Sequence, residues 1–214
     1  MILNQQYEDR HYPTSIASLR GNILENVKTY RYLGCEIKFN EHTTGVAELN
    51  LRSDAAECKF YSLARSMFNM KINLKIRITM LNALVRSRIV YACQTWNVTQ
   101  TQMRRMSSIY TTMIRKMTKG GYKRKDESWS YVHTNADLLR MSKTMPLESF
   151  VHKQQRNYIG HIVRKDNSSI VKRLMFNDDT SHKPGPQTTL LTSVIKTEAC
   201  SPDKLFRDAI ERKF

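Results

Sequence analysis

The sequence predicts a mainly α protein: a small N-terminal β-hairpin, then a helical bundle, then a second small helical region at the C-terminus. Apolar residues recur at three- and four-residue steps over 46–67, 74–89 and 103–117, which is the period of one helix face. Runs that favour strands are short and lie within 27–39. With 214 residues, 40% of them hydrophobic, the chain can build one ordinary domain or two small helical ones.

The first region, residues 1–43, carries Pro13, Gly21 and Gly34. Two β-favouring runs, 27–33 and 35–39, flank Gly34, and this arrangement predicts a hairpin that turns near the glycine. We expect a basic helical bundle over 44–126, tail helices over 127–182, and a linker with a C-terminal helix over 183–214.

The bundle begins with a predicted helix from Thr44 to Asn69. A second helix follows with Asn73 as its N-cap, and its apolar residues are so evenly spread that we expect a central helix buried nearly all round. Its basic residues form two pairs with a spacing of eleven residues, close to three helical turns, so each pair should lie along one line. The pairs are Lys75 with Arg86 and Arg77 with Arg88.

A third helix is predicted to begin after Thr99, because Thr99 and Gln102 have the spacing of a capping box. Its apolar stripe is rich in methionine, which we interpret as a plastic core rather than a ligand groove. The stripe consists of Met103, Met106, Tyr110, Met113 and Met117.

The opposite side of this third helix is predicted to be basic. Arg104 with Arg115, and Arg105 with Lys116, repeat the eleven-residue spacing. Gly120 and Gly121 should end the helix. We expect the following loop to extend the basic face with Lys123, Arg124 and Lys125.

The C-terminal part is predicted to contain three further helices. A short one should span about 135–142, and a longer one should open at Pro146, which suits a first turn. The run 183–186 combines Pro and Gly and indicates a linker. Ser201 and Pro202 then have the pattern of an N-cap and first turn, for a helix to about Arg212.

The charge is concentrated in the bundle. The formal net charge is +16, of which residues 44–98 carry +5 and residues 99–126 carry +7. Such crowding suits a protein that follows a phosphate backbone. An anionic membrane surface would also attract it, but no stretch approaches the roughly 18 apolar residues of a spanning helix and no signal-peptide pattern is present. We expect an intracellular protein, nuclear or cytoplasmic, without a membrane partner.

The sequence argues against an independent catalytic centre. It lacks a P-loop, GxGxxG, GxSxG and HExxH. Successive cysteines have 22, 34 and 106 residues between them, which fits no metal site, and we interpret all four as reduced and structural. Asp178 and Asp179 form an adjacent acidic pair within a turn-like stretch. His161 is interpreted as structural or as a phosphate contact.

Three stretches resemble, in this order, the C-terminal part of non-LTR (LINE-like, RTE-type) retrotransposon reverse transcriptases. They are 27–34 (VKTYRYLG), 75–77 with 85–96 (KIR, VRSRIVYACQTW) and 158–164 (YIGHIVR). The resemblance implies that the first stretch is the primer-grip hairpin and that the following helices are the thumb, which clamps template and primer. Many relatives carry Gly-Arg-Pro and Trp after the tail helix, whereas here Pro184-Gly185-Pro186 leads to Leu190.

In that family the catalytic aspartates of the palm precede the YLG strand. We therefore expect a nucleic-acid-binding fragment of an RNA-directed DNA polymerase, with no cofactor in this chain, although the full-length family uses Mg²⁺. Expected partners are RNA, DNA or an RNA–DNA hybrid, and the missing palm and fingers. Two alternatives stay open: the end of a split or longer active reverse transcriptase, and a degenerate remnant.

The resemblance and the basic lines together give a set of candidate contacts. The predicted nucleic-acid-binding residues are Tyr32, Gly34, Lys75, Arg77, Arg86, Arg88, Arg104, Arg105, Arg115, Lys116, Lys123, Arg124, Lys125, His161 and Arg164.

Overall fold

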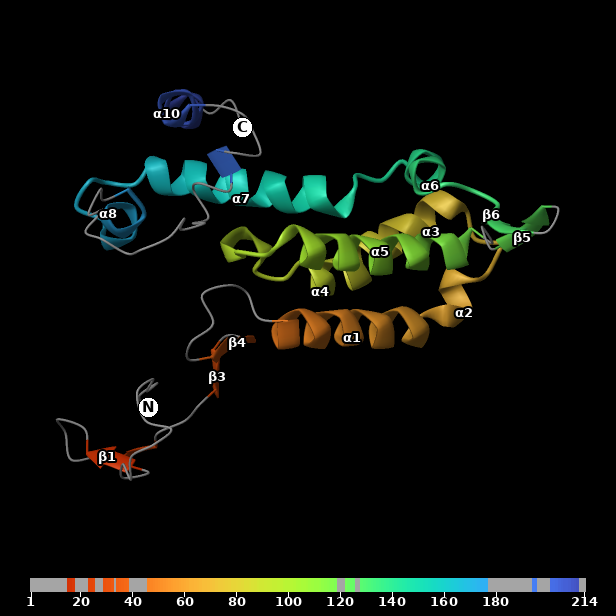
Figure 1. The fold of residues 1–214 in the computed structure, drawn as a ribbon, viewed down its shortest axis with the longest axis horizontal. Helices are drawn as coiled ribbons and strands as arrows, with labels where there is room; N and C mark the ends of the chain where they lie inside the picture. The colour runs from red at the N-terminus through yellow and green to blue at the C-terminus, as the bar shows by residue number, and fades with distance from the viewer. Residues whose placement is uncertain are drawn as a thin grey trace.

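A computed structural model describes residues 15–17, 23–25, 29–32, 34–38, 46–118, 122–125, 128–176, 194–195 and 201–211. The described part is mainly helical, as predicted (Figure 1). The α-helices are α1 (Val46–Ser62), α2 (Ala64–Met67), α3 (Leu74–Met80), α4 (Ser87–Ile89), α5 (Gln100–Met117), α6 (Asn135–Ser142), α7 (Leu147–Val163), α8 (Ile170–Phe176) and α10 (Pro202–Ile210). A π-helix, η1 (Leu81–Arg86), joins α3 to α4, and a 3-10 turn, η2 (Cys93–Thr95), follows α4. The helices stack in layers, with α5 between α1 and α7 (Figure 1).

The strands form separate antiparallel hairpins. The pairs are β1 (Ser15–Ala17) with β2 (Ile23–Glu25), β3 (Thr29–Tyr32) with β4 (Cys35–Lys38), and β5 (Tyr122–Lys125) with β6 (Ser128–Tyr131). The hairpin predicted around Gly34 is confirmed as β3–β4. Gly34 has a φ of +80°, a left-handed conformation that glycine adopts without a steric penalty. The predicted loop at 122–125 is wrong, because these residues pair with β6 as a strand.

The first predicted helix is interrupted. Instead of running on to Asn69, α1 ends at Ser62 and Leu63 leaves the helical path. The Ser62 hydroxyl bonds to the Lys59 carbonyl at 2.8 Å, a local bond that competes with the helix ladder. The short helix α2 then places Met67 in the core, fully buried.

The second predicted helix has its expected start but an unexpected interior. The Asn73 side chain accepts a bond from the Lys75 amide at 2.8 Å, which confirms the N-cap. The π-helix η1 then widens the turn, so residues after it are rotated relative to a straight α-helix. Full burial was a wrong expectation, since Ile76 and Leu84 are 55% and 39% exposed.

Helix α5 agrees closely with the sequence prediction. Thr99 and Gln102 form the capping box, and all five residues of the methionine-rich stripe are buried. The helix ends at Met117, before Gly120 and Gly121, which lie outside the described residues.

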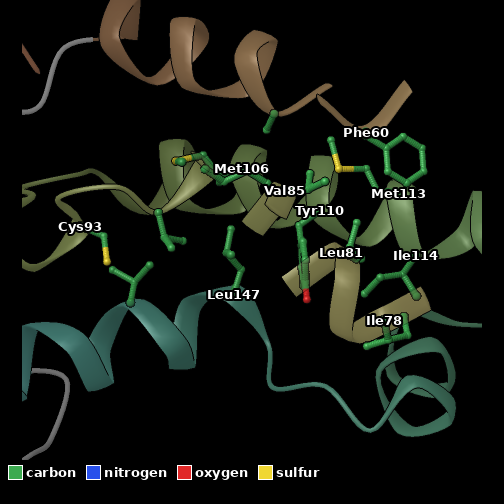
Figure 2. Packing of buried hydrophobic residues seen from close by; sticks show 14 of the residues in the cluster. Phe60, Ile78, Leu81, Val85, Cys93, Met106, Tyr110, Met113, Ile114 and Leu147 are labelled. Carbon is green, nitrogen blue, oxygen red and sulfur yellow. The ribbon is translucent and has the colours of Figure 1, made fainter. Parts of the chain in front are cut away.

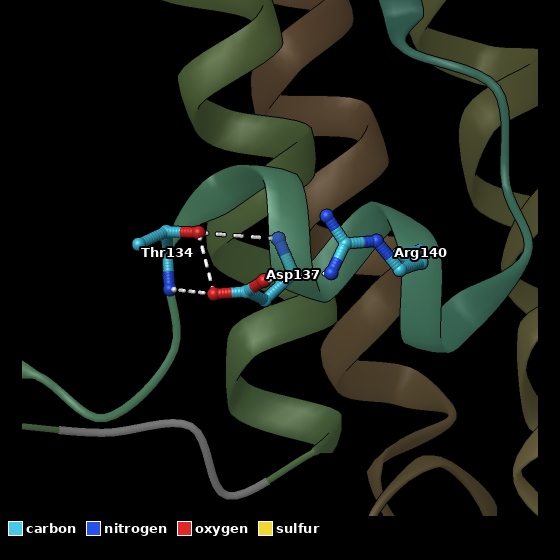
Figure 3. A network of polar contacts seen from close by, with 3 residues as sticks. All are labelled: Thr134, Asp137 and Arg140. Atoms are coloured by element: carbon cyan, nitrogen blue, oxygen red, sulfur yellow. Dashed lines mark hydrogen bonds and ion pairs between the residues drawn. The ribbon is translucent and has the colours of Figure 1, made fainter.

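The C-terminal helices also follow their local signals. Helix α6 has the predicted bounds, and Thr134 and Asp137 form a capping box with Arg140 beside it (Figure 3). Pro146 stands just before the first turn of α7, as its N-cap. Ser201 caps α10 through the Lys204 amide. The linker at 183–186 lies outside the described residues.

One hydrophobic core joins the bundle to the first tail helices. Tyr110, Phe60 and Leu81 are fully buried at its centre, where side chains from α1, η1 and α5 meet (Figure 2). Leu138 of α6 and Leu147 of α7 belong to the same cluster, so this core extends beyond residue 126. A second, smaller cluster lies where the end of α7 meets α10, and it contains Ile159, Val163, Val194 and Ala209.

Candidate nucleic-acid interface

The outward face of α5 is basic and free of acids. Its buried methionine stripe fixes which side faces the core, and Arg104, Arg105 and Lys116 consequently lie exposed on the other side. The helix contains no Asp or Glu, and the exposed Ser108 and Thr112 stand between these cations. Cations and hydroxyls are the groups that bind phosphate oxygens in nucleic-acid complexes.

Lys116 marks where this face meets α1. Its ammonium donates a hydrogen bond to the Tyr61 hydroxyl and lies 5.1 Å from the centre of the Tyr61 ring. Tyr61 itself is half-exposed. The basic face of α5 is therefore continuous with the exposed edge of α1.

Arg115 was predicted on this basic face, and that placement is wrong. Its side chain is buried, with Nη1 donating to the His133 carbonyl at 2.7 Å and Nη2 donating to the Asn135 side chain. The guanidinium thus ties the end of α5 to the start of α6. A buried group with these partners is not available to phosphate.

Arg77 is also buried, so its predicted place on an exposed line is wrong. Nη1 donates to the carbonyls of Met67 at 3.0 Å and Met117 at 2.8 Å, and Nε donates to the Ile72 carbonyl at 3.1 Å. Met67 and Met117 end α2 and α5, where unpaired carbonyls carry partial negative charge. Arg77 therefore joins two helix ends.

The remaining cations of the segment from α3 to α4 differ in exposure, and the π-helix η1 lies between Lys75 and Arg88. Lys75 is exposed at the start of α3, whereas Arg86 is half-buried with its guanidinium 4.3 Å from the centre of the Phe150 ring. Arg88 is exposed although it was paired with the buried Arg77. The lines of eleven-residue spacing do not hold here, because they assume an uninterrupted α-helix.

The other predicted residues lie on or just after α7 and in β5. His161 is exposed on α7, and Arg164 donates to the Ala209 carbonyl of α10 at 2.8 Å. The backbone of Lys123, Arg124 and Lys125 is part of β5. His161 and Arg164 are not among the residues that line the groove described next.

A groove of about 930 Å³ is lined by residues of the β3–β4 hairpin, α1 and the end of α4. Figure 1 shows this hairpin beside the start of α1. Gly34 and Arg88, both predicted, lie in its wall, and the predicted Tyr32 is exposed nearby on β3. Sequence reasoning missed several residues of this wall. They are Tyr30, Arg31, Glu48, Leu51, Arg52, Ala55, Ser87 and Tyr91.

The missed residues had a recognisable signal. Residues 28–32 read Lys-Thr-Tyr-Arg-Tyr, and residues 86–91 contain two arginines followed by a tyrosine. Aromatic residues interleaved with basic ones are common in proteins that bind single-stranded nucleic acid. The two runs come together because Tyr30, Arg31 and Gly34 line the same groove as Ser87, Arg88 and Tyr91.

Arg52 fastens the hairpin to the helices. Its Nη2 donates to the Gly34 carbonyl at 3.3 Å, and the guanidinium lies 4.9 Å from the centre of the Tyr91 ring. Glu48, one turn earlier on α1, forms an ion pair with Arg52, and both side chains are buried. The turn of the hairpin therefore has a defined position against α1 and Tyr91.

Two buried groups of the hydrophobic core have raised pKa values. Burial raises the pKa of the Tyr110 hydroxyl, which donates to the Asn82 side chain at 2.5 Å. Burial also raises the pKa of the Cys93 thiol to about 11. Both groups stay protonated and neutral near pH 7, so they add no negative charge beside the basic face.

The described residues contain neither a membrane-spanning helix nor a cluster of metal ligands. None of their helices is both long and apolar enough to cross a membrane. Within the same residues, no group of three or more His, Cys, Asp and Glu side chains is arranged to hold a metal ion. Comparison of the chain with protein-family models, curated proteins and solved structures found no match.

Proposed function

We propose that this chain binds nucleic acid and corresponds to the thumb and C-terminal part of a retrotransposon RNA-directed DNA polymerase, without polymerising by itself. The acid-free outward face of α5 carries this proposal. Arg104, Arg105 and Lys116 present three cations on one helix, with hydroxyl groups between them. A merely solvated helix face would be expected to mix charges of both signs.

The family assignment rests on the three sequence stretches and on one structural agreement. Of the stretch 27–34, the described residues 29–32 and 34 belong to a hairpin, as a primer grip would, and this hairpin packs against the helices that resemble a thumb. Those helices also carry the exposed cations, as a clamp on template and primer requires. RNA, DNA and their hybrid are therefore the proposed partners.

The exposed cations give an expected salt dependence. The α5 face and the groove together offer five exposed cations, namely Arg31, Arg88, Arg104, Arg105 and Lys116. If each neutralises one phosphate, the logarithm of the affinity should fall with the logarithm of salt concentration with a slope of about −4.5 for duplex and about −3.5 for a single strand.

Fluorescence anisotropy with labelled duplex, hybrid and single strands over a KCl series tests this function. The triple variant Arg104→Glu, Arg105→Glu, Lys116→Glu should lose at least about tenfold in affinity, and its slope should be shallower by about 3 on duplex. Arg115 is left unchanged because its reversal would disturb the fold.

A matched control distinguishes the effect of where the cations lie from the effect of the total net charge. Lys153→Glu, Lys204→Glu and Arg207→Glu reverse three exposed cations on α7 and α10, so both triple variants lower the net charge by six, from +16 to +10. We expect the control to keep most of the affinity. Equal losses in the two variants would show that net charge alone, and not the α5 face, determines binding.

A further inference from the structure

Three exposed tyrosines gather where the hairpin meets the helices. Tyr30 and Tyr32 are 40% and 56% exposed and share one face of β3, because side chains two residues apart point the same way. Tyr91, just after α4, is 49% exposed and lines the groove with Tyr30. Large aromatic rings left in water at one place usually mark a binding surface.

The Tyr91 ring is held in place before any ligand arrives. Arg52 lies 4.9 Å from the ring centre, and the hairpin turn packs beside it, since a Cβ on Gly34 would lie 3.7 Å from Tyr91 Cε1. The Glu48 ion pair holds Arg52 in turn. A ring that is already positioned loses little conformational entropy when a ligand stacks on it.

The charge of the groove suits a phosphodiester. Arg31 and Arg88 are exposed in its wall, while the charge of Glu48 is paired with Arg52 and buried. The groove therefore presents two accessible cations beside its aromatic rings. Aromatic rings combined with cations bind bases and backbone together.

The groove suits an unpaired base of a single strand better than the paired bases of a duplex. Its volume of about 930 Å³ lies within the range of about 300–1,000 Å³ that is typical of small-ligand sites. Bases in a duplex are stacked and paired, so their faces are not available to the tyrosines, and pulling one out costs energy that a single strand does not pay.

We propose that this groove takes an unstacked base of single-stranded nucleic acid, with Tyr30 and Tyr91 as stacking surfaces and Arg31 and Arg88 as contacts to the flanking phosphates. The inference rests on the proposed function and gives it a preferred ligand, a single strand. Because every base has an aromatic face, little dependence on base sequence is expected.

An abasic strand tests the groove directly, because it keeps the phosphates and lacks the bases. Anisotropy would compare oligo-dT, oligo-rU and an abasic DNA strand of equal length, about ten nucleotides, at one KCl concentration. The parent protein should bind oligo-dT or oligo-rU about 5- to 150-fold more tightly than the abasic strand, the range expected for one stacked base. Tyr91→Ala should reduce this ratio to about one.

Two further variants distinguish the loss of a stacking surface from a folding defect. Tyr91→Phe keeps the ring and should keep the ratio, whereas Tyr30→Ala removes the other stacking surface without touching Arg52 and should lower the ratio. Thermal melts by circular dichroism should match the parent for Tyr30→Ala.

The outcomes separate this inference from the proposed function. If the parent binds base-bearing and abasic strands equally, or if both alanine variants keep the parent's ratio, the groove does not stack a base, although phosphate binding by α5 stands. If the parent binds neither single strands nor duplex, the proposed function and this inference both fail.

Discussion

Arg77→Met is the substitution that most directly tests the buried arginine. Arg77 is 3% exposed, and its guanidinium donates three hydrogen bonds to the carbonyls of Met67, Ile72 and Met117. Methionine has a similar length and can occupy the same space, but it donates nothing. The substitution therefore leaves three carbonyls at the ends of α2 and α5 and in the connection to α3 without this donor.

The magnitude follows from two opposing effects. Hydrogen bonds from a charged donor contribute about 1.5–3 kcal/mol each, but two of these share Nη1 and are not fully additive. Removing the buried charge also relieves its desolvation, which offsets part of the loss. We expect a loss of about 2–4 kcal/mol in the free energy of unfolding, or about 5–15 °C in Tm for a chain of this size.

Chemical denaturation followed by circular dichroism measures the loss, and Lys75→Met is the matched control. Lys75 lies two residues away on the same helix and is exposed, so its replacement should change stability by less than about 0.5 kcal/mol. If Arg77→Met were as stable as Lys75→Met and instead weakened nucleic-acid binding at low temperature, Arg77 would be a surface contact and the burial described above would be refuted.

Two further predictions concern single groups. Iodoacetamide at about pH 8 should label Cys58 in the native protein far faster than Cys93. Cys58 is exposed, whereas Cys93 is buried and burial raises the pKa of its thiol to about 11. Equal labelling rates of the two cysteines, measured by peptide mass spectrometry, would contradict this. Bonds from Thr134 lower the pKa of Asp137 below its usual 3.8, so the folded state gains stability from this carboxylate above pH 3.8 and loses it as the pH falls through the lowered value. The Tm difference between the parent and Asp137→Asn should shrink over that acidic range, and a constant difference would show that ionisation is not involved.

Local sequence signals predicted most of the helices. The bounds of α6 and the N-caps at Asn73, Thr99 and Ser201 were predictable because a cap involves residues two or three positions apart. The buried stripe of α5 followed from its period. The break at Leu63 was not predictable in this way, because apolar spacing continues across it.

Long-range contacts explain what sequence reasoning missed in the site. Arg77 bonds to a carbonyl forty residues away, and Arg115 bonds to one eighteen residues away. Backbone carbonyls leave no trace in a sequence pattern, so both arginines were assigned to the surface. The groove was missed for the same reason, since it depends on Gly34 meeting Arg52 and Tyr91.

The chain uses arginine to satisfy helix ends, and this changes how its charge should be interpreted. Arg77, Arg115 and Arg164 each donate to backbone carbonyls, and the acceptors of Arg77 and Arg164 lie at or near the ends of α2, α5 and α10. With 19 acidic against 35 basic residues, carboxylates are scarce as partners. Part of the +16 charge is therefore structural, and a salt dependence set by the exposed cations should be shallower than the total charge suggests.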